Sequence, residues 1–222
     1  MESRPSSKRM SKGRKEAPIA FDGIVLGGGK SKRMGTNKVV LSIDGKAMLH
    51  MAVRALKGAN QVAVVAPAKV VAEVYSRKRP PGLIQTLEDP PFGGPVAGIL
   101  AGLEALGSDG AEIVGIVAGD HPRAPQALKA LKHAGALKLL SEGSCDGVCA
   151  GTKGSGPQLL LGFYSRKYLE AQVSEGAVGD GRDVSVKRLL GAAKLEVVTV
   201  PETDILDLDS PADLDRYGRS AK

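Results

Sequence analysis

Aromatic residues are scarce in this chain. Of its 222 residues, three are phenylalanine, four are tyrosine and none is tryptophan. Proteins that bind single-stranded nucleic acid stack the bases on aromatic side chains, and so few rings leave little for such a platform. We therefore expect no nucleic-acid partner, although a formal net charge of +7 would otherwise favour one.

The positive charge is concentrated near the start of the chain. The first 16 residues hold six Lys and Arg against two Glu, so only +3 of the net charge belongs to the remainder. We expect residues 1–17 to be a disordered basic tail and residues 18–222 to form one domain. A mildly basic domain suits small molecules that carry phosphate groups as well as it suits polynucleotides.

Cysteines and long apolar runs are also few. Cys145 and Cys149 are the only cysteines, and no neighbouring histidine or second pair completes a zinc site or a disulfide framework. No run approaches the roughly 18 apolar residues of a membrane-spanning helix. No apolar segment follows the basic N-terminal residues, as it would in a secretory signal. These absences predict a cytoplasmic protein without a membrane partner.

Strand and helix patterns alternate through residue 133. Continuous apolar runs predict strands at 20–26, 61–66, 83–87 and 112–118. Helical spacing of apolar residues predicts helices at 46–57 and 95–106, and prolines in a first turn predict another from about 122. This alternation predicts an α/β fold, a single-domain, Rossmann-like three-layer α/β/α sandwich with a mostly parallel sheet.

The later part of the chain is less regular. Strands are predicted at 159–164 and 195–200, with a helix near 183–191 between them. A last helix is predicted to begin with Ser210 as its N-cap and Pro211 at its first position. No internal repeat or long linker divides the chain, so we expect these elements to complete the same domain.

The first predicted strand runs into a loop of glycines and cations, L-G-G-G-K-S-K-R-M-G-T-N-K, at residues 26–38. Glycines allow the backbone to approach a ligand and to turn its N–H groups toward an anion. Four cationic side chains within nine residues supply charge for more than one phosphate. Neither common phosphate motif is present, because Ile24 and Lys32 stand where a P-loop and a dinucleotide fingerprint need glycine. A glycine-rich turn with solvated lysines is the alternative.

The loop resembles the signature of the molybdenum cofactor guanylyltransferase family, L-x-G-G-x-S-x-R-M-G-x-x-K. Segments 87–98, 118–122 and 207–211 resemble three further motifs of that family, so the resemblance covers roughly residues 20–217. It implies a nucleotide-diphosphosugar-transferase-like fold. It also implies an enzyme that transfers GMP from GTP to the phosphate of molybdopterin, with Mg²⁺ as cofactor and release of pyrophosphate.

Aspartates are the candidate metal ligands. Asp120 follows a buried strand at its carboxyl end, where open α/β sheets bind ligands, and Mg²⁺ takes one or two carboxylates beside substrate phosphates. Asp120 would alternatively cap the helix expected from about 122. Asp209 is the second metal candidate and Asp207 a candidate for the metal or the acceptor, although Asp-x-Asp-Ser-Pro is also a good helix entry.

The resemblance assigns the remaining roles. Arg33 and Lys38 hold the triphosphate and, with Asp120, are the catalytic candidates. The other nucleotide-binding candidates follow strand ends or begin a helix: Leu26, Gly27, Gly28, Gly29, Asp89, Gly94 and Pro95. Asp89 would accept hydrogen bonds from guanine. His121 and Arg182 are candidate acceptor contacts, and His121 is equally consistent with a residue that only starts a helix.

The nucleotide and the acceptor stay open at this point. The family usually has aspartate where Asn37 stands, and the paired aspartates of 207–209 also occur in related cytidylyltransferases. Gly28 and Gly29 favour the guanylyl branch. We expect GTP or another nucleoside triphosphate as one partner and a molybdopterin-type phosphate acceptor as the other, in a monomer or weak dimer. The alternatives are a cytidylyltransferase, a transferase for a different phosphate acceptor, or a relative that binds nucleotide without turnover, which Lys38 and Asp120 argue against.

Overall fold

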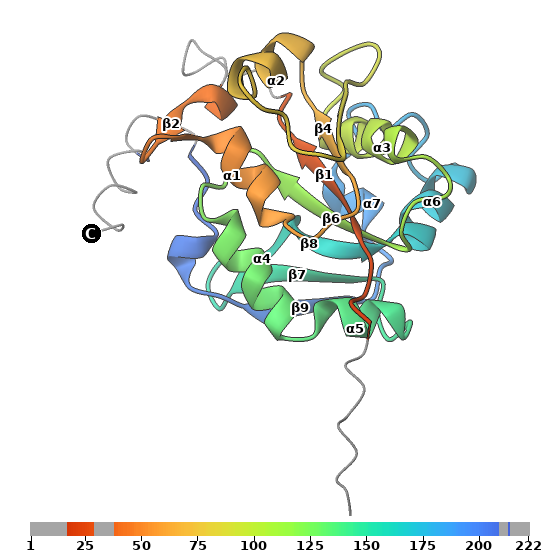
Figure 1. Ribbon diagram of the computed structural model, residues 1–222. Coiled ribbons are helices and arrows are strands. Elements are labelled where there is room, and N and C mark those ends of the chain that lie inside the picture. Colours follow the sequence, from red (N-terminus) through yellow and green to blue (C-terminus); the bar gives the residue numbers. More distant parts are fainter. Residues whose placement is uncertain (1–16, 29–37, 209–212, 214–222) are drawn as a thin grey trace, which may run out of the picture.

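A seven-stranded sheet in the order β5-β4-β1-β6-β8-β7-β9 forms the centre of the computed structural model, which describes residues 17–28, 38–208 and 213 (Figure 1). All of these strands run parallel except β8, which is antiparallel to both of its neighbours. The bounds of the seven strands are β1 Asp22–Leu26, β4 Val62–Val65, β5 Leu83–Thr86, β6 Ile113–Ala118, β7 Gly147–Thr152, β8 Gly156–Ser165 and β9 Leu195–Thr199. The predicted mostly parallel sheet is therefore confirmed.

Seven α-helices in the described part of the chain connect or flank these strands. They are α1 Met48–Ala55, α2 Ala68–Val74, α3 Pro95–Leu106, α4 Ala124–His133, α5 Ala136–Ser141, α6 Arg166–Ser174 and α7 Val186–Leu189. Two short 3-10 helices, η1 Lys38–Val40 and η2 Glu202–Asp204, and a small hairpin of β2 Ser42–Ile43 and β3 Lys46–Ala47 complete the domain. Within these described residues, no helix combines the length and the apolar character needed to cross a membrane.

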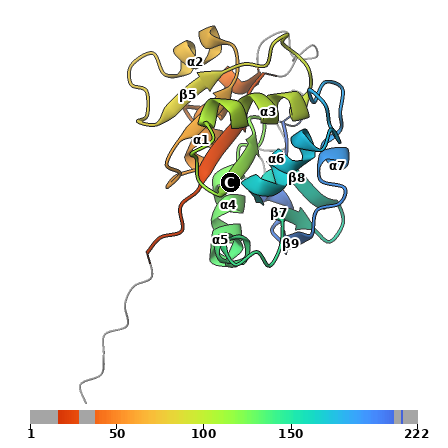
Figure 2. The same cartoon turned by 90° about the vertical axis from the view of Figure 1, so that its right-hand side faces the viewer.

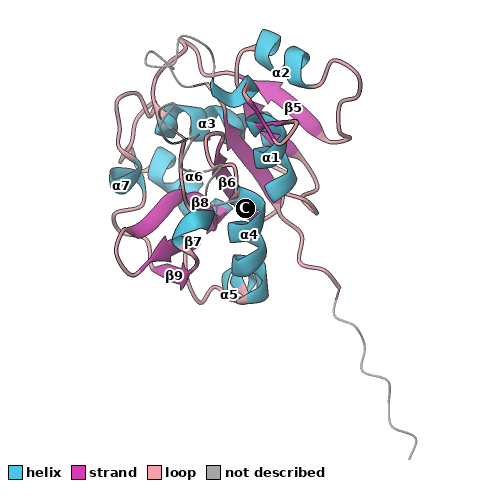
Figure 3. Cartoon of the chain, turned by 90° about the vertical axis from the view of Figure 1, so that its left-hand side faces the viewer, coloured by secondary structure: helices cyan, strands magenta, loops and turns pink. Residues whose placement is uncertain are grey.

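Helices cover both faces of the sheet, which makes the predicted three layers (Figure 2, Figure 3). The core on one face includes Leu128 of α4 and joins α1, α2, α4 and α5 to the sheet. The core on the other face includes Ile99 of α3 and joins α3, α6 and α7. Side chains alternate along each strand, so Ile24 of β1 enters the α3 side and Val25 enters the α1 side.

The predicted elements differ from the observed ones mainly at their ends. The helix at 95–106 has the bounds that its apolar spacing predicts. The helix predicted at 46–57 is shorter, because residues 46 and 47 pair with 43 and 42 in the hairpin. The helix near 183–191 is reduced to the single turn of α7. The helix expected after Ser210 lies outside the described residues except for residue 213, as does the tail 1–17 except for residue 17.

Besides the small hairpin and the two 3-10 helices, three α-helices and one strand of the main sheet were not predicted: α2, α5, α6 and β7. The last of these, G-V-C-A-G-T, is made of small residues and lacks the β-branched pattern typical of strands. It is nevertheless buried, because β8 pairs with one edge of it and β9 with the other. Its position in the sheet comes from these tertiary contacts and not from local propensity.

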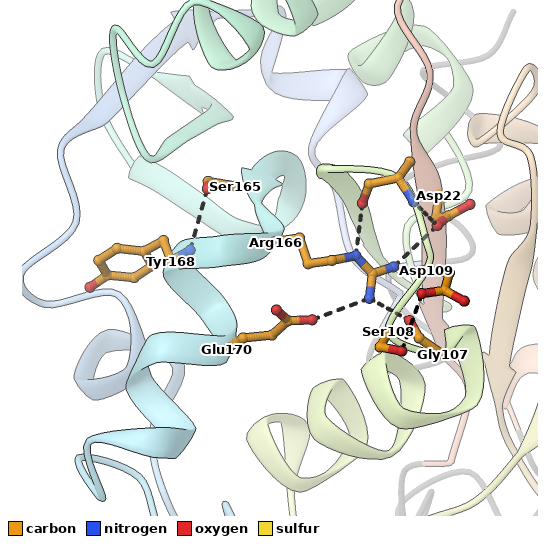
Figure 4. A network of polar contacts seen from close by, with 9 residues as sticks. Asp22, Gly107, Ser108, Asp109, Ser165, Arg166, Tyr168 and Glu170 are labelled. Atoms are coloured by element: carbon orange, nitrogen blue, oxygen red, sulfur yellow. Dashed lines mark hydrogen bonds and ion pairs between the residues drawn. The ribbon is translucent and has the colours of Figure 1, made fainter.

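A buried ion pair between Asp22 and Arg166 joins the start of β1 to the start of α6 (Figure 4). Oδ2 of Asp22 lies 3.1 Å from Nη2 of Arg166, and the two residues are 1% and 5% exposed. The Asp22 carboxylate also accepts backbone N–H bonds from Gln61 and Ala111. The guanidinium donates to the carbonyl oxygens of Ala111 and Gly107. The pair therefore has the additional hydrogen bonds that a desolvated ion pair needs.

Replacing Arg166 by methionine should destabilise the domain strongly, because it leaves the Asp22 carboxylate buried without its cation. We expect Arg166→Met to lower the free energy of unfolding by about 3–5 kcal/mol. The exposed pair Lys138–Glu142 provides the control, and Lys138→Met should cost less than about 1 kcal/mol. Urea unfolding followed by circular dichroism measures both changes. Similar losses in the two variants would contradict a central role for the buried pair.

Candidate active site

The carboxyl ends of β1 and β6 lie where the order of the sheet reverses. From β1 the chain passes outward through β4 and β5, and then returns through α3 to β6 on the other side of β1. Open α/β sheets bind ligands outside the carboxyl ends of the strands at such a point. Gly27 and Gly28 directly follow β1, and Gly119 and Asp120 directly follow β6. The sheet therefore brings together the first and third motifs of the sequence.

The two strand ends are in direct contact. The backbone N–H of Gly119 donates to the carbonyl oxygen of Leu26 at 2.9 Å, and that of Gly27 donates to the carbonyl oxygen of Val65 at 2.9 Å. A Cβ atom on Gly119 would lie only 2.8 Å from Cγ1 of Val39 and 3.0 Å from the Leu26 oxygen. Glycine at 119 is thus required by the close approach of the strands.

The packing of Val39 also fixes the position of the Lys38 backbone. Val39 is 6% exposed and belongs to the core on the α1 face, while Lys38 is the first residue of η1 and half-buried. Because Val39 fills the space beside Gly119, its neighbour Lys38 starts close to the strand ends. The other cation assigned to the triphosphate, Arg33, and the third glycine of the loop, Gly29, lie outside the described residues.

A segment near the C-terminus returns to the end of β6. The N–H of Leu208 donates to the carbonyl oxygen of Asp120 at 3.1 Å, and Nδ1 of the buried His121 lies 3.4 Å from the carbonyl oxygen of Leu206. Asp207 therefore lies between two residues that contact positions 120 and 121. Its side chain is exposed, as the binding of a ligand requires.

The side chain of Leu208 anchors this segment. Leu208 is 1% exposed and packs with Ile43 of the small hairpin and Met48 at the start of α1. These contacts join segments that are about 160 positions apart in the sequence. The sequence analysis missed both Leu208 and Val39, because each is an apolar residue next to a polar motif and its packing partner is distant. The one signal in the sequence is that each is a large apolar residue directly beside an aspartate or a lysine of a motif, which suggests that it is buried there.

The alternative role of Asp120 as a helix cap is wrong. Helix α4 begins at Ala124, its N-cap is Arg123, and no side chain caps its first turn. A turn at residues 119–123 separates Asp120 from the helix. Asp120 is half-buried at the strand end, so its carboxylate is available to a ligand at the switch point.

The donor set at this point suits Mg²⁺ bound mainly through substrate phosphates. Within the part of the chain that the structure describes, no three His, Cys, Asp or Glu residues form a group that could hold a metal ion. Magnesium is commonly held by one or two carboxylates, with phosphate oxygens and water as the other ligands. Asp120 would supply one of these carboxylates, and one further carboxylate would complete the ligands from the protein. Asp209, the expected second ligand, lies outside the described residues, directly after the anchored Leu208.

The loop between β5 and α3 forms a second wall of the site. A Cβ atom on Gly28 would lie 3.7 Å from Cδ1 of Leu87, which follows β5. A Cβ atom on Gly98 of α3 would lie 3.0 Å from Cδ2 of Leu26. The segment between Leu87 and Gly98 therefore lies beside the start of the glycine loop, at the same edge of the sheet.

Three predicted nucleotide-binding residues lie on this wall. Asp89, Gly94 and Pro95 are all exposed. Gly94 has a φ of 93°, and Pro95 then begins α3. The second motif thus reaches the same edge as the first and third.

The structure places Arg182 against this wall. Its Nη1 donates to the carbonyl oxygen of Pro90 at 2.5 Å, and the N–H of Asp183 donates to the carbonyl oxygen of Gly93 at 2.9 Å. Arg182 is half-buried by these contacts. The predicted acceptor contact therefore lies on the turn at residues 88–93, while His121 and Asp207 lie at the end of β6.

A cavity of about 680 Å³ lies away from the strand ends, between α3 and α6. Leu100 and Glu104 of α3 and Val173 of α6 line it, and Asp89 and Arg182 also border it. None of the residues at the ends of β1 and β6 contributes to it. The sheet topology identifies the switch point as the site, and Asp89 and Arg182 are the candidate site residues that also border this cavity.

The two cysteines are poor metal ligands. Both are free and buried, and burial raises the pKa of the Cys149 thiol to about 11. Burial, together with the nearby Glu196, also raises the pKa of Cys145. Metals bind the thiolate, and thiols with raised pKa values stay protonated at neutral pH.

Comparison with known proteins identifies relatives of the whole domain. Residues 23–194 match the family described as the MobA-like NTP transferase domain. A curated relative, named the probable molybdenum cofactor guanylyltransferase of Opitutus terrae, is 27% identical over 212 residues, which cover 90% of this chain and 96% of the relative. The region that matches the family, residues 23–194, contains the ends of β1 and β6, the turn at residues 88–93 and Arg182.

Solved structures share the fold. Molybdopterin-guanine dinucleotide biosynthesis protein A from Archaeoglobus fulgidus has a TM-score of 0.60 at 20% identity, over 90% of this chain and 98% of that one. A 4-diphosphocytidyl-2C-methyl-D-erythritol synthase from Anaerococcus prevotii has a TM-score of 0.68 at 13% identity, over 92% of this chain and 99% of that one. At these identities the likeness concerns the fold alone.

The contact of Gly119 with Leu26 predicts a steric cost for any side chain at 119. Gly119→Ala should lower the free energy of unfolding by about 1–3 kcal/mol. In the control Gly28→Ala, the nearest atoms lie 3.5 and 3.7 Å from the new methyl group, and stability should be unchanged or raised by up to about 1 kcal/mol. Urea titration of both variants measures the difference. Equal stability of the two would contradict the close approach of Val39 and Leu26 to Gly119.

Proposed function

The chain belongs to the MobA-like NTP transferase family, and we propose that it transfers GMP from GTP to the phosphate of a molybdopterin-type acceptor, releasing pyrophosphate. One observation carries the proposal: Gly27, Gly28, Asp120 and Asp207 converge at the switch point of the sheet. The name of the Opitutus terrae relative supports the choice of nucleotide and acceptor.

The cations and amides of the glycine loop bind the triphosphate. In this proposal the backbone N–H groups of Gly28 and Gly29 donate to its oxygens, and Lys38 and Arg33 neutralise its charge. Transfer of a phosphoryl or nucleotidyl group depends mainly on positioning and on charge stabilisation. The half-buried position of Lys38, one residue from the packed Val39, supports a fixed placement of its amine.

Asp120 and Asp209 would be the residues that hold Mg²⁺. When bound, the ion neutralises charge on the α-phosphate and on the departing pyrophosphate. Asp120 follows β6, and Leu208, whose N–H donates to the Asp120 carbonyl oxygen, directly precedes Asp209 in the sequence. Asp207 remains available to the metal or to the acceptor.

The reaction needs no general base from the protein. A phosphate monoester has a second pKa of about 6, so the acceptor phosphate carries an ionised oxygen at neutral pH. This oxygen forms a bond to the α-phosphorus of GTP, the bond from the α-phosphorus to the bridging oxygen breaks, and pyrophosphate leaves with that electron pair. The residues of the site align the two phosphates and stabilise the charge that develops.

The wall formed by the β5–α3 loop recognises the base. The Asp89 carboxylate accepts hydrogen bonds from N1–H and the 2-amino group of guanine, and Gly94 and Pro95 shape the pocket beside it. All three residues are exposed at the carboxyl edge of the sheet. Cytosine lacks this pair of adjacent donors, so Asp89 favours GTP over CTP.

The acceptor phosphate approaches from the side of β6. His121, Asp207 and Arg182 are the candidates to contact the acceptor. His121 and Asp207 lie beside Asp120, and Arg182 lies on the base-binding wall. We further propose that the enzyme works in the cytoplasm as a monomer or weak dimer, without a nucleic-acid or membrane partner.

Pyrophosphate release with each of the four nucleoside triphosphates, Mg²⁺ and purified molybdopterin tests the proposal. Turnover should occur with GTP, and Asp120→Asn should lower kcat by at least about a hundredfold, because the metal loses a charged ligand. Asp109→Asn, in the exposed turn before β6, is the matched control and should leave kcat within about twofold.

Three results would each overturn a part of the proposal. Turnover with CTP in place of GTP would move the chain to the cytidylyl alternative that the paired aspartates at 207 and 209 also suit. Undiminished turnover in Asp120→Asn would refute the mechanism. Turnover of GTP with a different phosphate acceptor would retain the reaction and replace molybdopterin.

A further inference from the structure

Phe92 differs from the other two phenylalanines of the chain in its exposure. Phe21 and Phe163 are 3% and 0% exposed, and their rings pack edge to face at 5.4 Å in the core. Phe92 is 46% exposed. Leaving a large apolar ring in water gives up the free energy that its burial would contribute, so a binding role for this ring is worth examining.

The backbone of Phe92 has an unusual conformation. Its φ is 69°, a left-handed value that bulky side chains rarely adopt. The Phe92 N–H donates to Oε1 of Glu88 at 2.9 Å. The carboxylate of Glu88 therefore holds the backbone of Phe92 within the turn.

A second element holds the turn from outside. Arg182 donates to the carbonyl oxygen of Pro90, and Asp183 donates to that of Gly93. A Cβ atom on Gly93 would lie 2.7 Å from Cβ of Ala97 and 3.0 Å from Nη1 of Arg182. The backbone is thus anchored on both sides of Phe92, and its ring is presented by a turn with little room to move.

The turn adjoins the proposed nucleotide site. It follows Leu87, whose side chain lies beside Gly28. Phe92 stands between Asp89 and Gly94 in the sequence, and both of these are exposed at the same edge of the sheet. The Phe92 ring therefore belongs to the β5–α3 loop, which is the wall that we propose to bind the base.

We propose that Phe92 stacks on the nucleobase of the bound nucleotide, with Glu88 and Arg182 as the residues that position it. The proposal rests on the nucleotidyltransferase function above and adds a binding contact to it. Hydrogen bonds from Asp89 select the edge of guanine, and the Phe92 ring contacts its face. Aromatic stacking on a base strengthens binding roughly 5- to 150-fold when measured by removing the ring.

The absence of tryptophan makes Phe92→Trp a direct reporter, because the variant has a single indole. Its fluorescence should be quenched when GTP is added, at the concentration at which calorimetry shows wild-type binding. Val197→Trp, on the edge strand β9 and remote from β1 in the sheet, is the control, since Val197 is 47% exposed. Its fluorescence should not change with GTP.

Kinetics separate a binding role from a purely structural one. Phe92→Asn removes the ring and retains a residue that tolerates the left-handed conformation. It should raise KM for GTP about tenfold and change kcat less than about threefold. Phe92→Tyr keeps a ring that can stack and should restore KM to within about twofold of the wild-type value. Thermal unfolding confirms that each variant is folded.

The outcomes distinguish this proposal from the proposed function. If wild-type enzyme binds and turns over GTP, but Phe92→Trp is not quenched and Phe92→Asn keeps its KM, the stacking proposal is wrong and the function stands. Quenching by molybdopterin alone would also overturn the assignment to the nucleobase. If the wild-type protein neither binds nor turns over any nucleotide, the proposed function fails and the stacking proposal fails with it.

Discussion

The buried ion pair between Asp22 and Arg166 joins parts of the chain that are 144 positions apart. Around it, the carbonyl oxygens of Gly107 and Ala111 accept from the same guanidinium, so the start of α6 and the turn before β6 meet the first strand. A desolvated pair is retained when its remaining hydrogen bonds are satisfied. This network fixes β1 beside β6 at the amino-terminal edge of the sheet, and the register of the two strands carries that alignment to the opposite edge.

At the carboxyl edge, the same two strands approach as closely as their backbones allow. The N–H groups of Gly27 and Gly119 donate to the carbonyl oxygens of Val65 and Leu26, so the glycine loop and the Asp120 carboxylate begin side by side at the reversal of the sheet order. Leu208, buried against the small hairpin, returns a second acidic segment to this place. The proposed transfer needs anchored charges rather than a catalytic base, and this is the kind of site that rigid strand ends provide.

Local patterns in the sequence predicted the elements that depend on local properties. The helix at 95–106 has regular apolar spacing and a proline at its start, and its bounds agree with the structure. Asp120 was predicted at a strand end because a run of apolar residues precedes it. The partner of Arg166, the anchoring of Leu208 and the burial of β7 depend on contacts between distant segments, so no local pattern could show them. The conformation of Phe92 likewise depends on two hydrogen bonds. Its own N–H donates to Glu88, and Arg182 donates to the carbonyl oxygen of Pro90 in the same turn.

The central claim is that the ends of β1 and β6 bind the nucleotide and its metal ion. An anomalous difference map from crystals grown with GTP and Mn²⁺ tests it most directly. The account predicts a metal peak at about 2.0–2.3 Å from a carboxylate oxygen of Asp120, with the triphosphate over Gly27 and Gly28. A peak remote from Asp120, or a triphosphate bound in the cavity between α3 and α6, would contradict it.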